Sequence, residues 1–345
     1  MFRSIAATIL ALAIIGVATP GRAQTPEEFY KDRQLTLIVG SDAGAGFDIY
    51  ARLLSRHIAR HLGPNVRFIV QNQPGAGSLT MINGVSNTGP RDGTVIGAPQ
   101  AGAALERLFH LLSPDGQAAK FDAASINWLG TMSQDVFTMF GWHKSAAKSV
   151  DDLKKETYAI GVAGPNSDGF LIGTLMNRLL GTRIKIVTGY QGAAAELLAL
   201  ERGEIDVAPM SYASALTIRP TLLTDKIFPV LLQMGAHKHR DLPDVPRFEE
   251  LVAPDERAVL DLIFAKYQIG RPFFVAPGVP ADRVAYLRKA FDEALKDPLL
   301  LEEAQKMSVE IDPIGGEKVQ AIFKDLFSKP DALVQKARNY LGTEK

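Results

Sequence analysis

The sequence predicts an α/β protein made of two doubly wound domains, and three observations lead to this fold class. A nearly continuous apolar run at 35–39 is followed by a glycine-rich loop and then by apolar residues at helical spacing from Asp48 onwards. The same succession of strand, loop and helix recurs at short spacing along the chain. After an apolar stretch at 126–142 it begins again, so the second domain should repeat the architecture of the first.

The expected elements follow from these runs in chain order. In the first domain we expect strands at 35–39, 66–70 and 94–98, and helices at 48–62, 79–85 and 103–112. In the second domain we expect strands at 158–162, 184–187, 205–209 and 227–234, and helices at 170–180 and 193–202. A partly helical segment at 248–265, an extended segment at 272–276 and helices at 281–295, 299–307 and 317–341 complete the chain. We therefore assign 24–133 plus 265–345 to domain 1 and 134–264 to domain 2.

The first 23 residues predict a secretory signal peptide. They carry one basic residue, Arg3, then an apolar run at 5–17 and small residues up to Ala23, after which we expect cleavage. No later segment is long and apolar enough to cross a membrane, so we expect no direct membrane insertion. The chain has 38 basic and 38 acidic residues and no cysteine. This composition offers no general attraction to nucleic acid and excludes disulfides and thiol chemistry.

Six loops follow expected strands, and their composition points to binding without catalysis. They lie at 41–47, 73–78, 98–102, 163–169, 189–193 and 210–214. All are rich in small or amide residues, and none contains Lys, Arg or His, so a general base or an activated nucleophile is missing. Their main-chain N–H and hydroxyl groups suit a small polar ligand, above all where the first loop leads into a helix N-terminus. The alternative is a structural role, in which the glycines only permit tight turns.

Other motifs are weak. Gly44-Ala45-Gly46 lacks the third glycine of a dinucleotide fingerprint, because Ile49 stands there. His57 and His61 lack a third metal ligand and are expected on a partly exposed helix face. We therefore expect no catalytic residue, no metal and no cofactor. The expected ligand-binding residues are Ser41, Ala43, Gly44, Ala45, Gly46, Phe47, Asp48, Gln100, Ala101, Asn166, Ser167, Asp168, Tyr190, Gln191, Gly192 and Ser211. For Tyr190, contact with the ligand and filling of the core remain equal alternatives.

An ordered set of short motifs covers nearly the whole chain after the signal peptide. They lie at 44–48 with Arg52, at 72–77, at 91–94, at 189–192 with 203–206, and at 276–280 with 297–298. In this order and spacing they resemble the tripartite tricarboxylate transporter substrate-binding receptors, also called the Bug family. The resemblance implies a type II periplasmic binding protein of the Venus-flytrap kind, with a ligand cleft between its two domains. It further implies that the first loop and the 189–192 region grip one carboxylate, and that the ligand passes to membrane transporter subunits.

The sequence differs from the family in the charged residues near the expected cleft. Gln191 replaces the family's lysine, and Asp42 and Asp168 add negative charge near the expected cleft, so positive charge is missing there. We therefore expect a monocarboxylate or an amine-bearing acid rather than a tricarboxylate. We expect a monomeric receptor. Two other functions stay open: an exported enzyme acting on a carboxylated substrate, and a ligand sensor that feeds a signalling partner.

Overall fold

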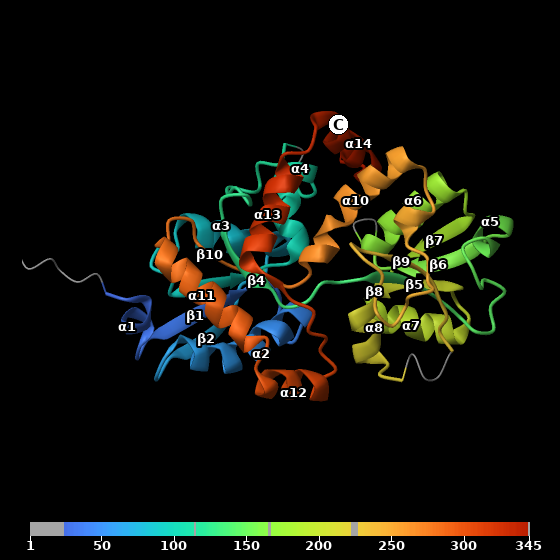
Figure 1. The fold of residues 1–345 in the computed structure, drawn as a ribbon. Coiled ribbons are helices and arrows are strands. Elements are labelled where there is room, and N and C mark those ends of the chain that lie inside the picture. The colour runs from blue at the N-terminus through green and yellow to red at the C-terminus, as the bar shows by residue number, and fades with distance from the viewer. Residues whose placement is uncertain (1–23, 114, 165–166, 222–226, 344–345) are drawn as a thin grey trace, which may run out of the picture.

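The computed structural model describes residues 24–113, 115–164, 167–221 and 227–343. The expected signal peptide lies outside these residues. Within them the chain forms two units, each built around one mixed β-sheet with helices packed against it (Figure 1). The α/β fold class with two sheets, predicted from the sequence, is confirmed.

The two sheets share one strand order. The first sheet comprises β1 (Gln34–Val39), β2 (Arg67–Asn72), β3 (Val95–Ala98), β4 (Asn127–Thr131), β10 (Pro272–Val275) and β11 (Ile314–Gly315). The second comprises β5 (Phe137–Gly141), β6 (Tyr158–Val162), β7 (Ile184–Thr188), β8 (Val207–Ser211) and β9 (Val230–Met234). Read in matching directions, the orders are β2-β1-β3-β10-β4-β11 and β7-β6-β8-β5-β9, and β11 is an additional edge strand of the first sheet. β10 runs antiparallel to β3 and β4, just as β5 runs antiparallel to β8 and β9. Each unit thus receives its antiparallel strand directly after the chain has crossed from the other unit.

Helices connect these strands. They are α1 (Pro26–Tyr30), α2 (Gly46–Leu62), α3 (Leu79–Asn87), α4 (Glu106–Phe109), α5 (Asp152–Lys155), α6 (Asp168–Leu180), α7 (Ala193–Arg202), α8 (Tyr212–Ile218), α10 (Pro254–Ile269), α11 (Ala281–Ala294), α12 (Pro298–Lys306), α13 (Gly316–Phe327) and α14 (Asp331–Leu341). Figure 1 shows α10 and α14 where the two units meet. No helix in the described ranges combines the length and apolarity that a bilayer crossing requires.

The core of the first unit forms around β4. The fully buried Trp128 stacks on Phe323 of α13, with 4.3 Å between ring centroids, and lies 5.6 Å from Phe274 of β10. α2 buries an apolar stripe that includes Leu53 and Ile58. Because β1, β2 and β3 are parallel, as are β6, β7 and β8, the loops after them emerge at one edge of each sheet.

The structure corrects several expected elements. The segment 317–341 is two helices, α13 and α14, because Pro330 disfavours helical geometry at the residue before it and has no N–H to donate. The expected helix at 103–112 is a 3-10 turn at Ala101–Leu105 followed by α4, which ends at His110 with φ 55°. His57 is buried rather than partly exposed, because α12 brings Glu303 within 2.6 Å of its ring. The domain boundaries stay a prediction.

Candidate functional site

The side chain of Asp48 anchors the glycine loop that follows β1. This carboxylate is buried, and it accepts hydrogen bonds from the Gly44 N–H, the Arg52 guanidinium and the Asn72 amide, each at 2.8 Å. Burial by itself raises the pKa of Asp48, but the bonds from Arg52, Gly44 and Asn72 outweigh it and hold that pKa below its ordinary value. Asn72 also donates to the Ser41 carbonyl. Asp48 therefore fixes the loop, and it does not line the cavity described next.

A cavity of about 480 Å³ opens where this loop meets α2. The residues lining it are Gly40, Ser41, Asp42, Ala45, Gly46, Phe47, Pro74, Gly75, Gly77, Gln100, Ser214 and Arg271. α2 has 17 residues, and its N-cap residue Ala45 has no side chain that accepts a hydrogen bond from the first turn. The N-terminus of a helix carries free N–H groups and partial positive charge, so this wall of the cavity favours an anion.

Ser41 adds an unpaired hydroxyl to the same wall. The residue is only 5% exposed, and among the described residues its Oγ atom has no hydrogen-bond partner. Buried hydroxyl groups are normally paired, because an unmade hydrogen bond costs about 1–3 kcal/mol. Because Ser41 lines the cavity, its hydroxyl is a candidate partner for a ligand oxygen there.

Arg271 brings positive charge to the cavity, which corrects the expectation that such charge is missing. It lies between α10 and β10, with its guanidinium 4.5 Å from the ring centroid of Phe47 and 5.3 Å from that of Tyr50. One terminal nitrogen lies 3.4 Å from Asp135, while Nε has no partner among the described residues. Arg271 escaped the sequence reasoning because it lies on a crossing segment outside the six loops. In the sequence, its position between Gly270 and Pro272 is the feature that could have indicated this residue.

The second unit reaches the cavity through α8. Ser214 lines it, whereas the expected Ser211 caps α8 and donates to Asp135 at 2.6 Å. The cavity is therefore bounded by both units, with Arg271 on the segment that connects them.

A second cavity, of about 520 Å³, shares Gly77 and Gln100 with the first. Ser167 and Asp168 line it from the second unit, and Asp168 forms an ion pair with Lys266 of α10. Lys266 is a further cation that the loop-based reasoning missed. Since Asp168 is paired, it does not add free negative charge to the cleft as expected.

The expected site residues thus divide into two groups. The structure gathers Ser41, Ala45, Gly46, Phe47, Gln100, Ser167 and Asp168 around the two cavities. Ala43, Gly44, Asp48, Ala101, Tyr190, Gln191, Gly192 and Ser211 do not line either of them, and Asn166 lies outside the described residues. Tyr190 packs its ring beside Gly161 at the edge of the second unit's core, and its contact with a ligand stays a prediction.

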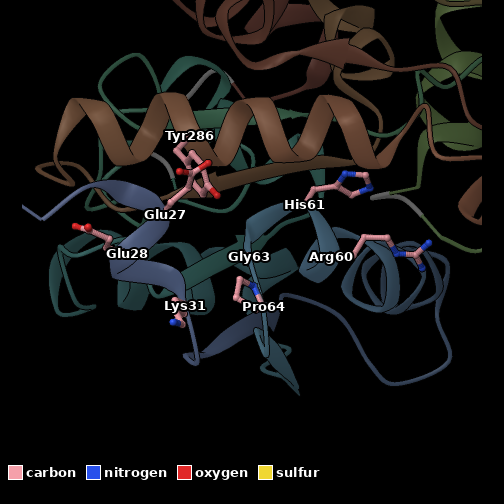
Figure 2. Close-up of a pocket in the computed structure, with 8 residues that line it drawn as sticks. All are labelled: Glu27, Glu28, Lys31, Arg60, His61, Gly63, Pro64 and Tyr286. Carbon is pink, nitrogen blue, oxygen red and sulfur yellow. The ribbon is translucent and has the colours of Figure 1, made fainter.

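A third pocket lies at the opposite end of α2 (Figure 2). It is formed by α1, the end of α2 and Tyr286 of α11, and it measures about 410 Å³. A helix of 17 residues is about 25 Å long, so this pocket is remote from the glycine loop. Two of its three basic residues, Arg60 and His61, are already bound to Asp297, at 2.9 and 3.1 Å, and the third, Lys31, lies beside Glu27 and Glu28 in the pocket lining. It is therefore a weaker candidate for an anion site.

Sequence comparison finds relatives across most of the chain, although no protein-family model matches. A UPF0065 protein from Agrobacterium vitis is 26% identical over 299 residues, covering 85% of this chain and 80% of that protein. A UPF0065 protein from Bordetella bronchiseptica is 22% identical over 323 residues, covering 92% and 86%.

Structural comparison finds the same fold in solved periplasmic binding proteins. A ligand-free TctC solute-binding protein from Polaromonas has a TM-score of 0.67 at 19% identity, covering 91% of this chain and 98% of that one. The periplasmic binding protein BugD scores 0.60 at 20% identity, covering 92% and 100%. MatC from Rhodopseudomonas palustris, solved with bound malate, scores 0.58 at 18% identity, covering 90% and 98%. The resemblance to the Bug family that the sequence motifs indicated is confirmed, and these neighbours are solute-binding proteins rather than enzymes.

Proposed function

We propose that this protein is a periplasmic substrate-binding receptor of the tripartite tricarboxylate transporter type. It captures a small carboxylate-bearing metabolite between its two domains and delivers it to the membrane subunits of the transporter. The observation that carries this proposal is the first cavity, where the uncapped N-terminus of α2, the unpaired Ser41 hydroxyl and Arg271 converge. All three favour a negatively charged oxygen.

The available donors are sufficient for tight binding. Hydrogen bonds to a charged group contribute about 1.5–3 kcal/mol each, and micromolar affinity corresponds to about 8 kcal/mol. The first-turn N–H groups, Ser41 and Arg271 together supply four or more such bonds, which leaves a margin for the cost of ordering the ligand. The carboxylate lies against the glycine loop, and Ser214 of the second unit approaches it as the units close.

Closure turns ligand binding into a signal for the transporter. We place the ligand-gripping domains at 24–133 plus 265–345 and at 134–264, joined by the segments that cross between β4 and β5 and before β10. A ligand held by both domains favours the closed arrangement, and membrane subunits can then distinguish the loaded receptor from the empty one. The signal peptide expected from the sequence and the similarity in fold to MatC, which was solved with bound malate, support this assignment.

The proposal is tested by binding measurements on two matched glycine variants. A Cβ atom on Gly46 would meet no protein atom within 4 Å, and the same is true of Gly84 in α3, which is remote from both cavities. We expect Gly46→Val to abolish binding of carboxylic acids in titration calorimetry while preserving the melting temperature. Gly84→Val should bind as the wild type does. Unchanged affinity in Gly46→Val removes the glycine loop from the site.

A second measurement separates a receptor from an enzyme. Native mass spectrometry of the protein purified from its host should reveal a bound acid, and prolonged incubation should return that acid chemically unchanged. Among the described residues lining the first cavity, Asp42 and Arg271 are the only ionisable ones, so Asp42 is the one carboxylate whose action as a general base this measurement tests. A ligand that is converted during incubation contradicts the proposal.

A further inference from the structure

Four of the 16 described residues that line the second cavity are leucines, and they are its largest apolar side chains. Leu111 and Leu112 follow α4, Leu171 lies on α6 and Leu341 on α14. Leu111 is 39% exposed and Leu112 is 53% exposed, so both place apolar surface in contact with water. Because the four leucines come from three separate elements and both units, they converge on one space. A volume of about 520 Å³ lies within the range of pockets that hold small molecules.

The exposure of these leucines is enforced by a buried carboxylate. Glu106 of α4 is fully buried, and it accepts hydrogen bonds from the Leu112 N–H at 2.8 Å and the Ser113 N–H at 2.9 Å. The Ser113 hydroxyl donates to it as well, at 2.9 Å. Glu106 thus fixes the loop that carries Leu111 and Leu112 over the cavity, which gives them a defined rather than a fluctuating position.

The carboxylates and the lysine of this cavity are already engaged, which leaves the half-buried His110 as the remaining ionisable group among the described residues that line it. Glu106 has the three donors just described, and Asp168 is paired with Lys266. A second carboxylate on a ligand would have to displace Asp168 from Lys266, and an amine would have to displace Lys266 from Asp168. Either exchange breaks one ion pair to make another, so a charged end on the ligand gains little here.

The two cavities adjoin at Gly77 and Gln100, which line both. We propose that the ligand is a monocarboxylic acid with an apolar chain or ring, and that this apolar part occupies the second cavity. This inference rests on the proposed function, and it adds that the tail of the ligand, rather than a second carboxylate, provides selectivity.

The test compares two series of acids on the full chain by titration calorimetry, with saturation-transfer NMR for weak binding. One series is butanoate, hexanoate and octanoate; the other is succinate, adipate and suberate, with the same numbers of carbon atoms. Each buried methylene strengthens binding by up to about fourfold, equivalent to about 0.8 kcal/mol. We expect affinity to rise steadily from butanoate to octanoate, and octanoate to bind at least tenfold more tightly than suberate.

Paired double variants locate the tail. Leu111→Asn with Leu112→Asn should weaken octanoate binding about tenfold and leave butanoate binding unchanged. The matched control, Leu299→Asn with Leu301→Asn, alters leucines of α12 that are 55% and 41% exposed and remote from the cavity, and it should change neither affinity.

The outcomes separate this inference from the proposed function. If butanoate binds and is lost in Gly46→Val, but chain length has no effect, the tail site is refuted and the receptor stands. Tighter binding of suberate than of octanoate also refutes the tail site, as does an equal effect of the two double variants. If none of the six acids binds, the inference fails together with the carboxylate site on which it rests.

Discussion

Replacing Asp48 by asparagine should destabilise the first unit by about 2–4 kcal/mol. The carboxylate accepts three hydrogen bonds at 2.8 Å, and a bond to a charged group contributes about 1.5–3 kcal/mol. The full sum is not lost, because Arg52 is 41% exposed and recovers water when its partner is removed. The Asn72 amide is less exposed, and the asparagine NH2 group at position 48 would oppose another donor. We also expect weaker carboxylate binding, because the glycine loop loses its anchor.

Urea unfolding followed by tryptophan fluorescence measures this effect. In a Trp142→Phe background the buried Trp128 reports on the first unit alone. The matched control is Asp42→Asn, which removes the same charge from an exposed position in the same loop and should change stability by less than about 0.5 kcal/mol.

The pH dependence gives the refuting result. The pKa of Asp48 is lowered in the folded protein, so its contribution is full above the ordinary carboxyl pKa and is lost as pH falls through the lowered value. The difference between wild type and Asp48→Asn should therefore be large at pH 7 and shrink below about pH 4. A difference that does not vary with pH, or an equal loss in Asp42→Asn, contradicts the anchoring role.

Three further predictions concern other parts of the molecule. Burial raises the pKa of Glu196 from 4.5 to about 7, so stability should decline as pH rises through that interval; in urea titrations Glu196→Gln should abolish the decline and stabilise the protein at pH 8 by about 1–3 kcal/mol. A decline that persists in the variant would assign it to another group. Gly97→Val should lower the melting temperature far more than Gly84→Val, because a Cβ atom at 97 collides with the Phe274 ring, and equal shifts would show that the core can repack. Arg271→Lys should weaken carboxylate binding about tenfold in calorimetry, since lysine lacks the planar fork of donors; unchanged affinity would exclude a direct contact.

The pattern of apolar residues was sufficient to predict individual strands and helices, because neighbouring residues determine them. The strand at 35–39 is apolar throughout and the helix after it has apolar residues at helical spacing, so β1 and α2 were predicted to within two residues at most ends. The loops after parallel strands follow from the same reasoning, because parallel strands end at one edge. Five expected residues of the first cavity, from Ser41 to Gln100, were accessible in this way.

What the sequence did not reveal depends on how distant segments are placed together. Lys266 lies on α10 and Arg271 on the segment between α10 and β10, and their position beside the cleft depends on the arrangement of both units. Asp48 belongs to the glycine motif, but its role becomes visible only once Asn72, 24 residues later, is brought beside it. His57 likewise seemed a surface residue until α12, from the far end of the chain, covered it.

The position of the last described residues matters for anyone who handles this protein. Leu341, Gly342 and Thr343 line the second cavity, so an affinity tag attached at this end would extend from a segment that forms part of the cavity wall. Such a tag could compete with the tail of a ligand or hinder docking on membrane subunits, and it would make a functional receptor look inert. Purification is better served by a tag inserted between the expected cleavage site after Ala23 and Thr25, since α1 lies away from α14 in Figure 1 and lines neither of the two cavities.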